Sequence, residues 1–189
     1  MDSAGRQNGP VVDPSSFRSG KVLLTAPIRA ITISQPYASL IASGEKWVEN
    51  RIWPTNFRGP IAIHAGKGTQ YLSRREQREQ GYPTGAVVAI AELVTCIPYL
   101  PGHSSWMRSH GSHTLQRLGI SVDDFLAHPH TEGPWCWILR RVCKLVHPYP
   151  CRGAQGLWRW GRNGLLVDVL YRADIMSRPV EAALEEATP

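Results

Sequence analysis

Short apolar runs, separated by glycine and proline, dominate the middle of the chain and are typical of β-strands. We expect strands at residues 30–34, 46–53, 59–67, 85–96, 133–150 and 163–170. Helical patterns cover residues 35–43, the polar segment 70–80, and a stretch near 112–126 inside an otherwise irregular insert at 97–132. Since these helices do not alternate regularly with the strands, the sequence predicts the α+β class: a small mixed β-barrel of five or six strands with a few flanking helices.

The two ends of the chain differ from this middle part. Residues 1–28 mix Gly, Pro, Ser and Asp without periodicity, which predicts a disordered leader. Residues 171–189 end in a short acidic, helix-like segment, which we expect to be a loosely held C-terminal tail. The remaining residues, 29–170, are enough for one hydrophobic core and too few for two.

Several classes of protein are disfavoured by the sequence. No apolar run approaches the roughly 18 residues of a membrane span, and the N-terminus lacks the apolar segment of a signal peptide. We therefore expect a cytoplasmic protein with no membrane partner, whose four cysteines are reduced. The histidines of the insert lack matching Cys or acidic spacing, so the sequence predicts neither a metal site nor a cofactor.

The charge of the chain is concentrated in its middle part. Of the formal net charge of +6, all falls between residues 30 and 170, where 15 Lys and Arg face 9 Asp and Glu. An excess of basic residues within a folded domain is typical of nucleic-acid binding. A basic surface that meets an acidic protein partner is the alternative.

One stretch, SGEKWVENR at 43–51, places charged side chains beside a predicted strand. On a regular strand Glu49 and Arg51 face the same side, whereas Lys46 faces the other. The three charges can converge only if Lys46 lies in the turn after the helix, which Gly44 permits. In the simpler interpretation they are incidental ion pairs on an exposed strand, worth about 0–1 kcal/mol.

Further candidate ligand-binding residues lie outside this stretch. They are aromatic, basic or polar side chains near the ends of predicted elements: Tyr37, Trp53, His64, Lys67, Gln155 and Trp158. Aromatic rings of this kind can stack on nucleic-acid bases. The alternative is that the rings belong to the core and that His64 is a hydrogen-bonded core residue.

The charged stretch fits the pattern G-x-K-x-x-E-x-R, and its flanks include ISQPYASLI, IAIHAGK, GAVVAIAELVTC and GPWCWIL…GAQGLWRW. With these flanks in order, residues 30–168 resemble the ASCH family (activating signal cointegrator homology), particularly its bacterial and phage single-domain members. The resemblance implies a PUA-like β-barrel, a cleft where the motif lies next to the helix, and RNA binding. One bacterial branch deacylates N4-acetylcytidine with a Lys at the position of Lys46 and a Thr at the position of Glu49, so the role of that Thr does not carry over. Other members are described as ribonucleases, without a motif that transfers to this chain.

Three functions remain open at this point. The first is an RNA- or nucleotide-binding cleft, in which Lys46 and Arg51 bind phosphate or base oxygens and Glu49 accepts a base amine. The second is a hydrolase of an acylated or modified nucleoside such as N4-acetylcytidine, with Lys46 and Glu49 as catalytic residues that transfer a proton. The third is a protein-interaction module. Glu49 could also simply hold Arg51 in place.

Overall fold

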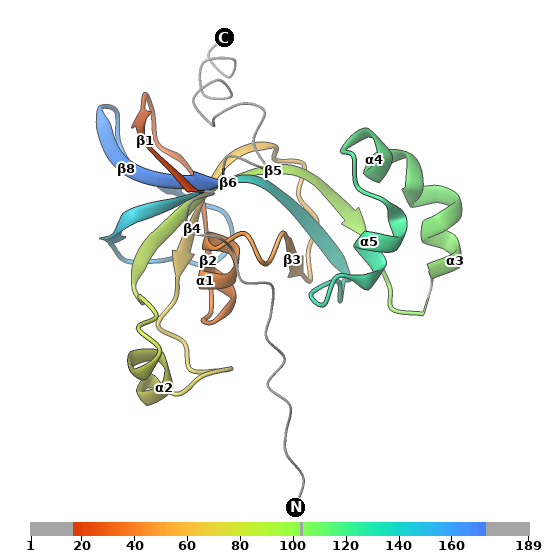
Figure 1. Ribbon diagram of the computed structural model, residues 1–189, viewed down its shortest axis with the longest axis horizontal. Helices are drawn as coiled ribbons and strands as arrows, with labels where there is room; N and C mark the ends of the chain where they lie inside the picture. Colours follow the sequence, from red (N-terminus) through yellow and green to blue (C-terminus); the bar gives the residue numbers. More distant parts are fainter. Residues whose placement is uncertain (1–16, 103, 173–189) are drawn as a thin grey trace, which may run out of the picture.

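The computed structural model describes residues 17–102 and 104–172, which form one mixed sheet with short helices around it (Figure 1). The strands are β1 Phe17–Leu24, β2 Ile28–Ile33, β3 Val48–Arg51, β4 Gly59–Ala65, β5 Ala86–Pro98, β6 Trp135–Pro150, β7 Trp158–Trp160 and β8 Leu165–Arg172. Their order is β1-β8-β6-β5-β4-β2-β7, and β3 pairs with β6 off this path. The α+β class is confirmed.

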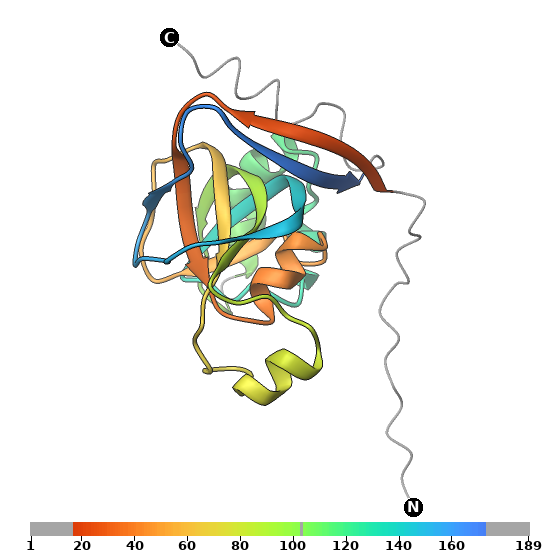
Figure 2. The ribbon, with the colours of Figure 1, turned by 90° about the vertical axis from the view of Figure 1, so that its left-hand side faces the viewer.

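The strands curve around a common interior (Figure 2), but in the described part of the chain the sheet is not closed. Its path ends at β1 on one side and at β7 on the other. The expected barrel is therefore not confirmed, and the expected count of five or six strands is too low because eight strands form. Strands β1 and β7 are the additional ones, and they are the two ends of the path.

The central strand β4 is buried on both faces of the sheet. In β4, residues Pro60 to Ala65 are all buried. Alternate residues of this strand enter two different apolar clusters: Ile61 and Ile63 pack with helix α1 (Tyr37–Ala42), whereas Ala62 packs with residues of β1 and β8. This double burial explains why the strand reads as a nearly continuous apolar run.

The expectation of disorder through residue 28 is wrong for residues 17–24. Strand β1 pairs antiparallel with β8 from Phe17↔Arg172 to Leu24↔Leu165. Val22 and Leu24 are buried while Lys21 and Leu23 are exposed, so a period of two was present but was hidden by the polar composition of the surrounding residues. Residues 1–16 of the predicted leader and 173–189 of the predicted tail lie outside the described residues.

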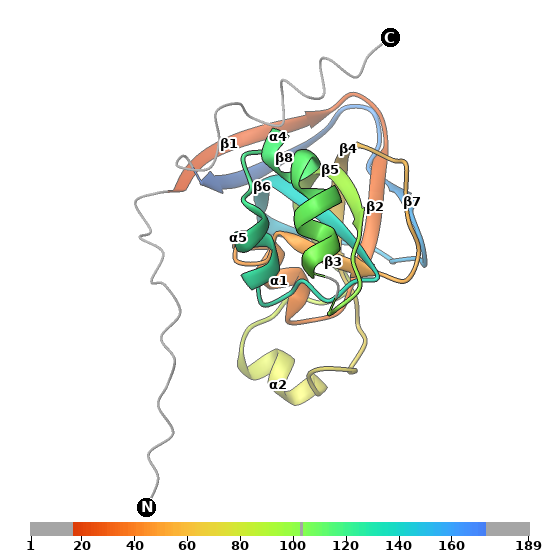
Figure 3. The same cartoon turned by 90° about the vertical axis from the view of Figure 1, so that its right-hand side faces the viewer.

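The insert folds into more helices than the sequence indicated. It contains α3 (Ser104–Trp106), a π-helical turn (Met107–Gly111), α4 (Ser112–Arg117) and α5 (Val122–Ala127) instead of one helix near 112–126. The chain breaks between α4 and α5 because Gly119 adopts a φ of 66° and the Ser121 side chain caps α5 by accepting from the Asp124 backbone N–H. This helical group lies beyond the ends of β5 and β6 (Figures 1 and 3).

Helix α2 (Arg74–Glu79), between β4 and β5, is shorter than the predicted 70–80. It lies apart from the sheet, at the bottom of Figures 1 to 3. None of the described helices has the length and apolar character needed to cross a membrane. The four cysteines all lie within the described residues, and no disulfide bond joins any two of them.

Candidate functional site

The three charges of the sequence motif converge, which decides between the two interpretations that the sequence left open. Glu49 Oε2 lies 3.0 Å from Lys46 Nζ, and its Oε1 lies 3.0 Å from Arg51 Nη2. Strand β3 begins only at Val48, so Lys46 precedes it in the turn after α1. Gly44 has a φ of 81°, which an L-residue with a side chain rarely adopts, and this turn brings Lys46 onto the side of Glu49.

Lys46, Glu49 and Arg51 form an ion-pair cluster, of which Lys46 and Glu49 are buried. Lys46 is 2% exposed and Glu49 is 7% exposed. The Lys46 ammonium also donates a hydrogen bond to the Val48 carbonyl and lies 5.7 Å from the centre of the Tyr37 ring. Both oxygens of the Glu49 carboxylate are engaged by cations, so the carboxylate is committed to holding Lys46 and Arg51.

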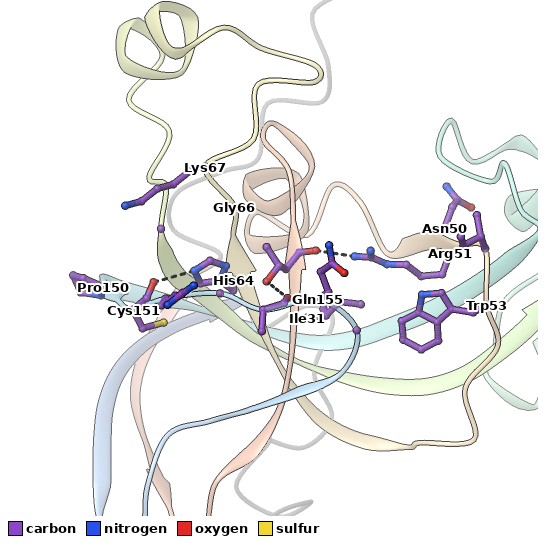
Figure 4. A pocket seen from close by; sticks show the side chains of 17 residues that line it. Ile31, Asn50, Arg51, Trp53, His64, Gly66, Lys67, Pro150, Cys151 and Gln155 are labelled. Atoms are coloured by element: carbon purple, nitrogen blue, oxygen red, sulfur yellow. Dashed lines mark hydrogen bonds between the residues drawn. The ribbon is translucent and has the colours of Figure 1, made fainter.

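Arg51 connects this cluster to an open groove. Its Nη2 also donates to the Thr32 carbonyl at 3.0 Å, and Arg51 itself lines the groove, whose volume is about 1090 Å³. The lining combines the ends of β2, β3 and β4 with the loop after β6: Ile31, Thr32, Asn50, Arg51, Ile52, Trp53, His64, Gly66, Lys67, Gly85 and residues 150–156. Figure 4 shows Arg51 and Trp53 on one side, with His64, Lys67 and Cys151 on the other.

The floor of the groove follows from the parallel pairing of β2 with β4. Their register places Thr32 opposite His64, near the carboxyl ends of both strands. The loop of residues 151–156 is fastened to this floor: Thr32 Oγ1 donates to the Ala154 carbonyl at 2.9 Å, and His64 Nε2 lies 3.2 Å from the Cys151 carbonyl oxygen. Two adjacent strand ends thus fix the position of one wall.

Gly153 is the point where this wall meets the floor most closely. A Cβ at this position would lie 2.4 Å from His64 Cε1 and 2.8 Å from Thr32 Oγ1. A side chain at position 153 would therefore force the loop, the histidine or both to move. The glycine is required by this close approach.

Every charged residue that lines the groove, within the described ranges, is a cation: Arg51, Lys67 and Arg152. Trp53 adds an aromatic surface, and its ring is held edge-on against Trp137 with 4.7 Å between ring centres. Cations beside an aromatic surface can bind phosphate and a base together.

The predicted site residues divide into two groups. Arg51, Trp53, His64, Lys67 and Gln155 line the groove. The others lie outside the groove. Lys46 and Glu49 form the buried part of the ion-pair cluster, and the Tyr37 ring packs against Tyr71 and His130. The Trp158 ring packs against His64, with 5.6 Å between ring centres.

Residues that the sequence did not single out also line the groove, chiefly Thr32, Asn50, Arg152 and Gly153. The available signal was the segment CRGAQG at 151–156, where two glycines and an arginine follow a long strand. A glycine-rich loop after a strand often lets the backbone approach a ligand closely. Thr32 and Asn50 carried no comparable signal.

Burial lowers the pKa of His64 below its usual value, and the nearby Lys67 lowers that pKa further, against the opposing effect of the hydrogen bond to the Cys151 carbonyl. The side chain is 3% exposed. His64 is therefore neutral near pH 7, and its Nε2–H donates to the loop carbonyl. This is the hydrogen-bonded core histidine of the alternative interpretation, although it also lines the groove.

Burial also lowers the pKa of His128, to about 4, with a smaller contribution from His130. In the unfolded chain His128 binds a proton near pH 6.5, whereas in the folded protein it stays neutral down to about pH 4. The contribution of neutral His128 to stability is therefore complete above pH 6.5 and is lost as the pH falls toward about 4. We expect the melting temperature of His128→Gln to depend less on pH than that of wild type between pH 6.5 and about pH 4. Equal profiles for wild type and His128→Gln would contradict the prediction.

Within residues 17–102 and 104–172, no group of three His, Cys, Asp or Glu side chains is arranged to hold a metal ion. The insert histidines His128 and His130 instead pack against each other, with 5.5 Å between ring centres.

Comparison with known proteins identifies the family of this chain. The family model of the ASCH domain matches residues 31–145, more than half of the chain. The chain belongs to the ASCH family. The ASCH domain is a PUA-like domain proposed to bind RNA. The matched residues include the ion-pair cluster and the ends of β2 and β4, whereas the loop 151–156 follows the matched range.

Two ASCH-related proteins are similar to this chain. Human activating signal cointegrator 1 is 24% identical over an alignment of 143 residues, and the alignment covers 68% of this chain and 22% of that protein. The chain thus spans about a fifth of the length of that relative. The crystal structure of ASCH from Zymomonas mobilis shares 18% identity and has a TM-score of 0.42, with 70% of this chain and 87% of that chain covered.

Proposed function

We propose that this ASCH domain binds RNA and that one nucleotide of the RNA occupies the groove. The observation that carries the proposal is the charge of the groove: Arg51, Lys67 and Arg152 line it, and no carboxylate does so in the described residues. Such a lining attracts phosphate without the repulsion that an acidic residue would add. Membership of a family proposed to bind RNA supports the same function.

Each part of the groove has a proposed role. Lys67 and Arg152 bind phosphate oxygens, and Arg51 donates to phosphate or to a base oxygen. Trp53 offers its ring to the base. Gln155 supplies both a donor and an acceptor at the exposed rim, which suits the edge of a base.

The ion-pair cluster acts from behind the groove. Glu49 neutralises Lys46 and fixes the guanidinium of Arg51, whose side chain is 23% exposed. Of the roles considered for Glu49, holding Arg51 fits its contacts best. Because Lys46 and Glu49 are paired with each other and buried, the geometry favours binding over hydrolysis of a modified nucleoside.

Salt dependence tests this function. We expect Lys67→Ala and Arg152→Ala each to weaken the binding of single-stranded RNA and to reduce the slope of log K against log salt by about 0.7, the value for one phosphate contact. Fluorescence anisotropy at several salt concentrations measures both quantities. Lys21→Ala, an exposed residue of β1 that pairs with Asp168, is the control and should change neither. Equal effects from all three variants would mean that the attraction is diffuse and that the groove is not the site.

A further inference from the structure

A second, smaller hollow lies beside helix α2. Its volume is about 420 Å³, and it is lined by Lys67, Arg74, Gln77, Arg78, Tyr82 and Thr84. Lys67 lines this hollow and the groove, so the two meet at its side chain. Figure 4 shows Lys67 at the side of the groove from which the chain continues toward α2.

Two of the arginines of α2, Arg74 and Arg78, border this hollow. Arg74 and Arg78 are four residues apart and therefore project from the same face of the helix. Neither has a carboxylate within ion-pair distance in the described part of the chain, whereas Arg75 pairs with Glu79 at 2.7 Å. Two arginines and Lys67 thus border one hollow, which no carboxylate residue lines, together with Tyr82 and Thr84.

The second acid of α2 is also committed elsewhere. Glu76 accepts hydrogen bonds from the Ser73 backbone N–H at 2.8 Å and from its hydroxyl at 2.7 Å, and Glu76 N–H donates to Ser73 Oγ. This capping box fixes the start of the helix. Neither Glu76 nor Glu79 lines the hollow.

Helix α2 is held in a fixed position relative to Lys67. Gln77 is 4% exposed, and its Nε2 donates to the carbonyls of Gly68 and Leu72 at 2.8 and 2.9 Å. These bonds hold the helix against the segment that follows Lys67, two residues after the end of β4. The Lys67 side chain in turn lies over Gly85, where an added Cβ would come within 2.3 Å of Lys67 Cε.

We propose that this hollow is a second phosphate subsite for a polynucleotide strand. The nucleotide in the groove is followed by a backbone that passes Lys67, and the adjacent phosphate is bound by Arg74 and Arg78. The proposal rests on the function proposed above and narrows its ligand: the domain recognises a continuous strand and gains affinity from the second phosphate, which a free nucleoside or a single nucleotide cannot supply.

Length dependence of binding tests the subsite. The ligands are UMP, 5′-phosphorylated oligouridylates of two, three and six nucleotides, and UTP, each titrated by calorimetry against wild type and Arg74→Ala/Arg78→Ala. For wild type we expect affinity to rise about tenfold or more between UMP and the trinucleotide, equivalent to about 1.4 kcal/mol. In the double variant that rise should disappear, with UMP binding unchanged within about twofold. Arg75→Ala is the matched control and should keep the full rise.

The possible outcomes separate this subsite from the groove. The subsite is overturned if affinity rises with length equally in wild type and in the double variant. It is also overturned if UTP binds wild type as tightly as the trinucleotide does and binds the double variant more weakly, because a polyphosphate would then occupy the hollow. If Trp53→Ala and Arg152→Ala leave every ligand bound as in wild type, the proposed groove function fails instead. If wild type binds none of the ligands, both proposals fail.

Discussion

Glu49→Gln is expected to destabilise the domain by about 3–5 kcal/mol, the usual cost of removing one partner of a buried ion pair. The substitution keeps the shape and one acceptor oxygen but removes the charge, which leaves the ammonium of Lys46 buried at 2% exposure without a counter-ion. The substitution also breaks the ion pair of Glu49 with Arg51, so RNA affinity should fall as well as stability. Chemical denaturation measures the first effect and fluorescence anisotropy the second.

Glu79→Gln is the matched control for this prediction. It breaks the Arg75–Glu79 pair, whose side chains are 81% and 57% exposed. Exposed pairs of this kind contribute about 0–1 kcal/mol, so stability should hardly change. A stable Glu49→Gln variant that binds RNA with altered preference among bases would instead show that the carboxylate contacts a base.

Gly153→Ala is expected to weaken RNA binding by about tenfold or more, a change of about 1.4 kcal/mol. The added methyl group would meet His64 and Thr32 at 2.4 and 2.8 Å, distances at which atoms must move. Forced packing of this kind costs about 1–3 kcal/mol. We expect the loop 151–156 to move outward, because the floor belongs to the core of the sheet and the loop does not. The bond from Thr32 Oγ1 to the Ala154 carbonyl should then break.

Gly68→Ala separates this effect from a general intolerance of glycine substitution. A Cβ at position 68 meets only Ser34 Oγ, at 3.5 Å, an ordinary contact. Its RNA affinity and melting temperature should equal those of wild type. Wild-type affinity in Gly153→Ala would contradict the role given to the loop.

The sequence indicated what the convergence of Lys46, Glu49 and Arg51 would require, because a local rule governs it. Strand parity excluded Lys46 from a regular strand with Glu49, and Gly44 offered the turn that resolves the conflict. The turn is present, with Gly44 at a φ of 81° and β3 starting after Lys46. The burial of Lys46 and Glu49 could not be predicted from this pattern, because burial depends on segments distant in sequence that pack over the motif.

The groove itself was only partly predictable. His64 and Lys67 lie at the end of a strand that the sequence indicated clearly, but Thr32 and Arg152 reach the groove through contacts made across the fold. Thr32 bonds to Ala154, which is 122 residues away. Strand β1 was missed for a related reason: its alternation is visible at Val22 and Leu24, yet the strand is stabilised by pairing with β8 at the other end of the chain.

The proposed position of the RNA is tested most directly by the amide chemical shifts of the protein in two-dimensional NMR, recorded during titration with a single-stranded RNA. Binding in the groove predicts the largest changes at the backbone amides of Thr32, Lys67 and residues 151–156, with the amides of β1 and α5 unchanged. Changes concentrated on β1, or on the helices of the insert, with the groove amides unaffected, would contradict the account.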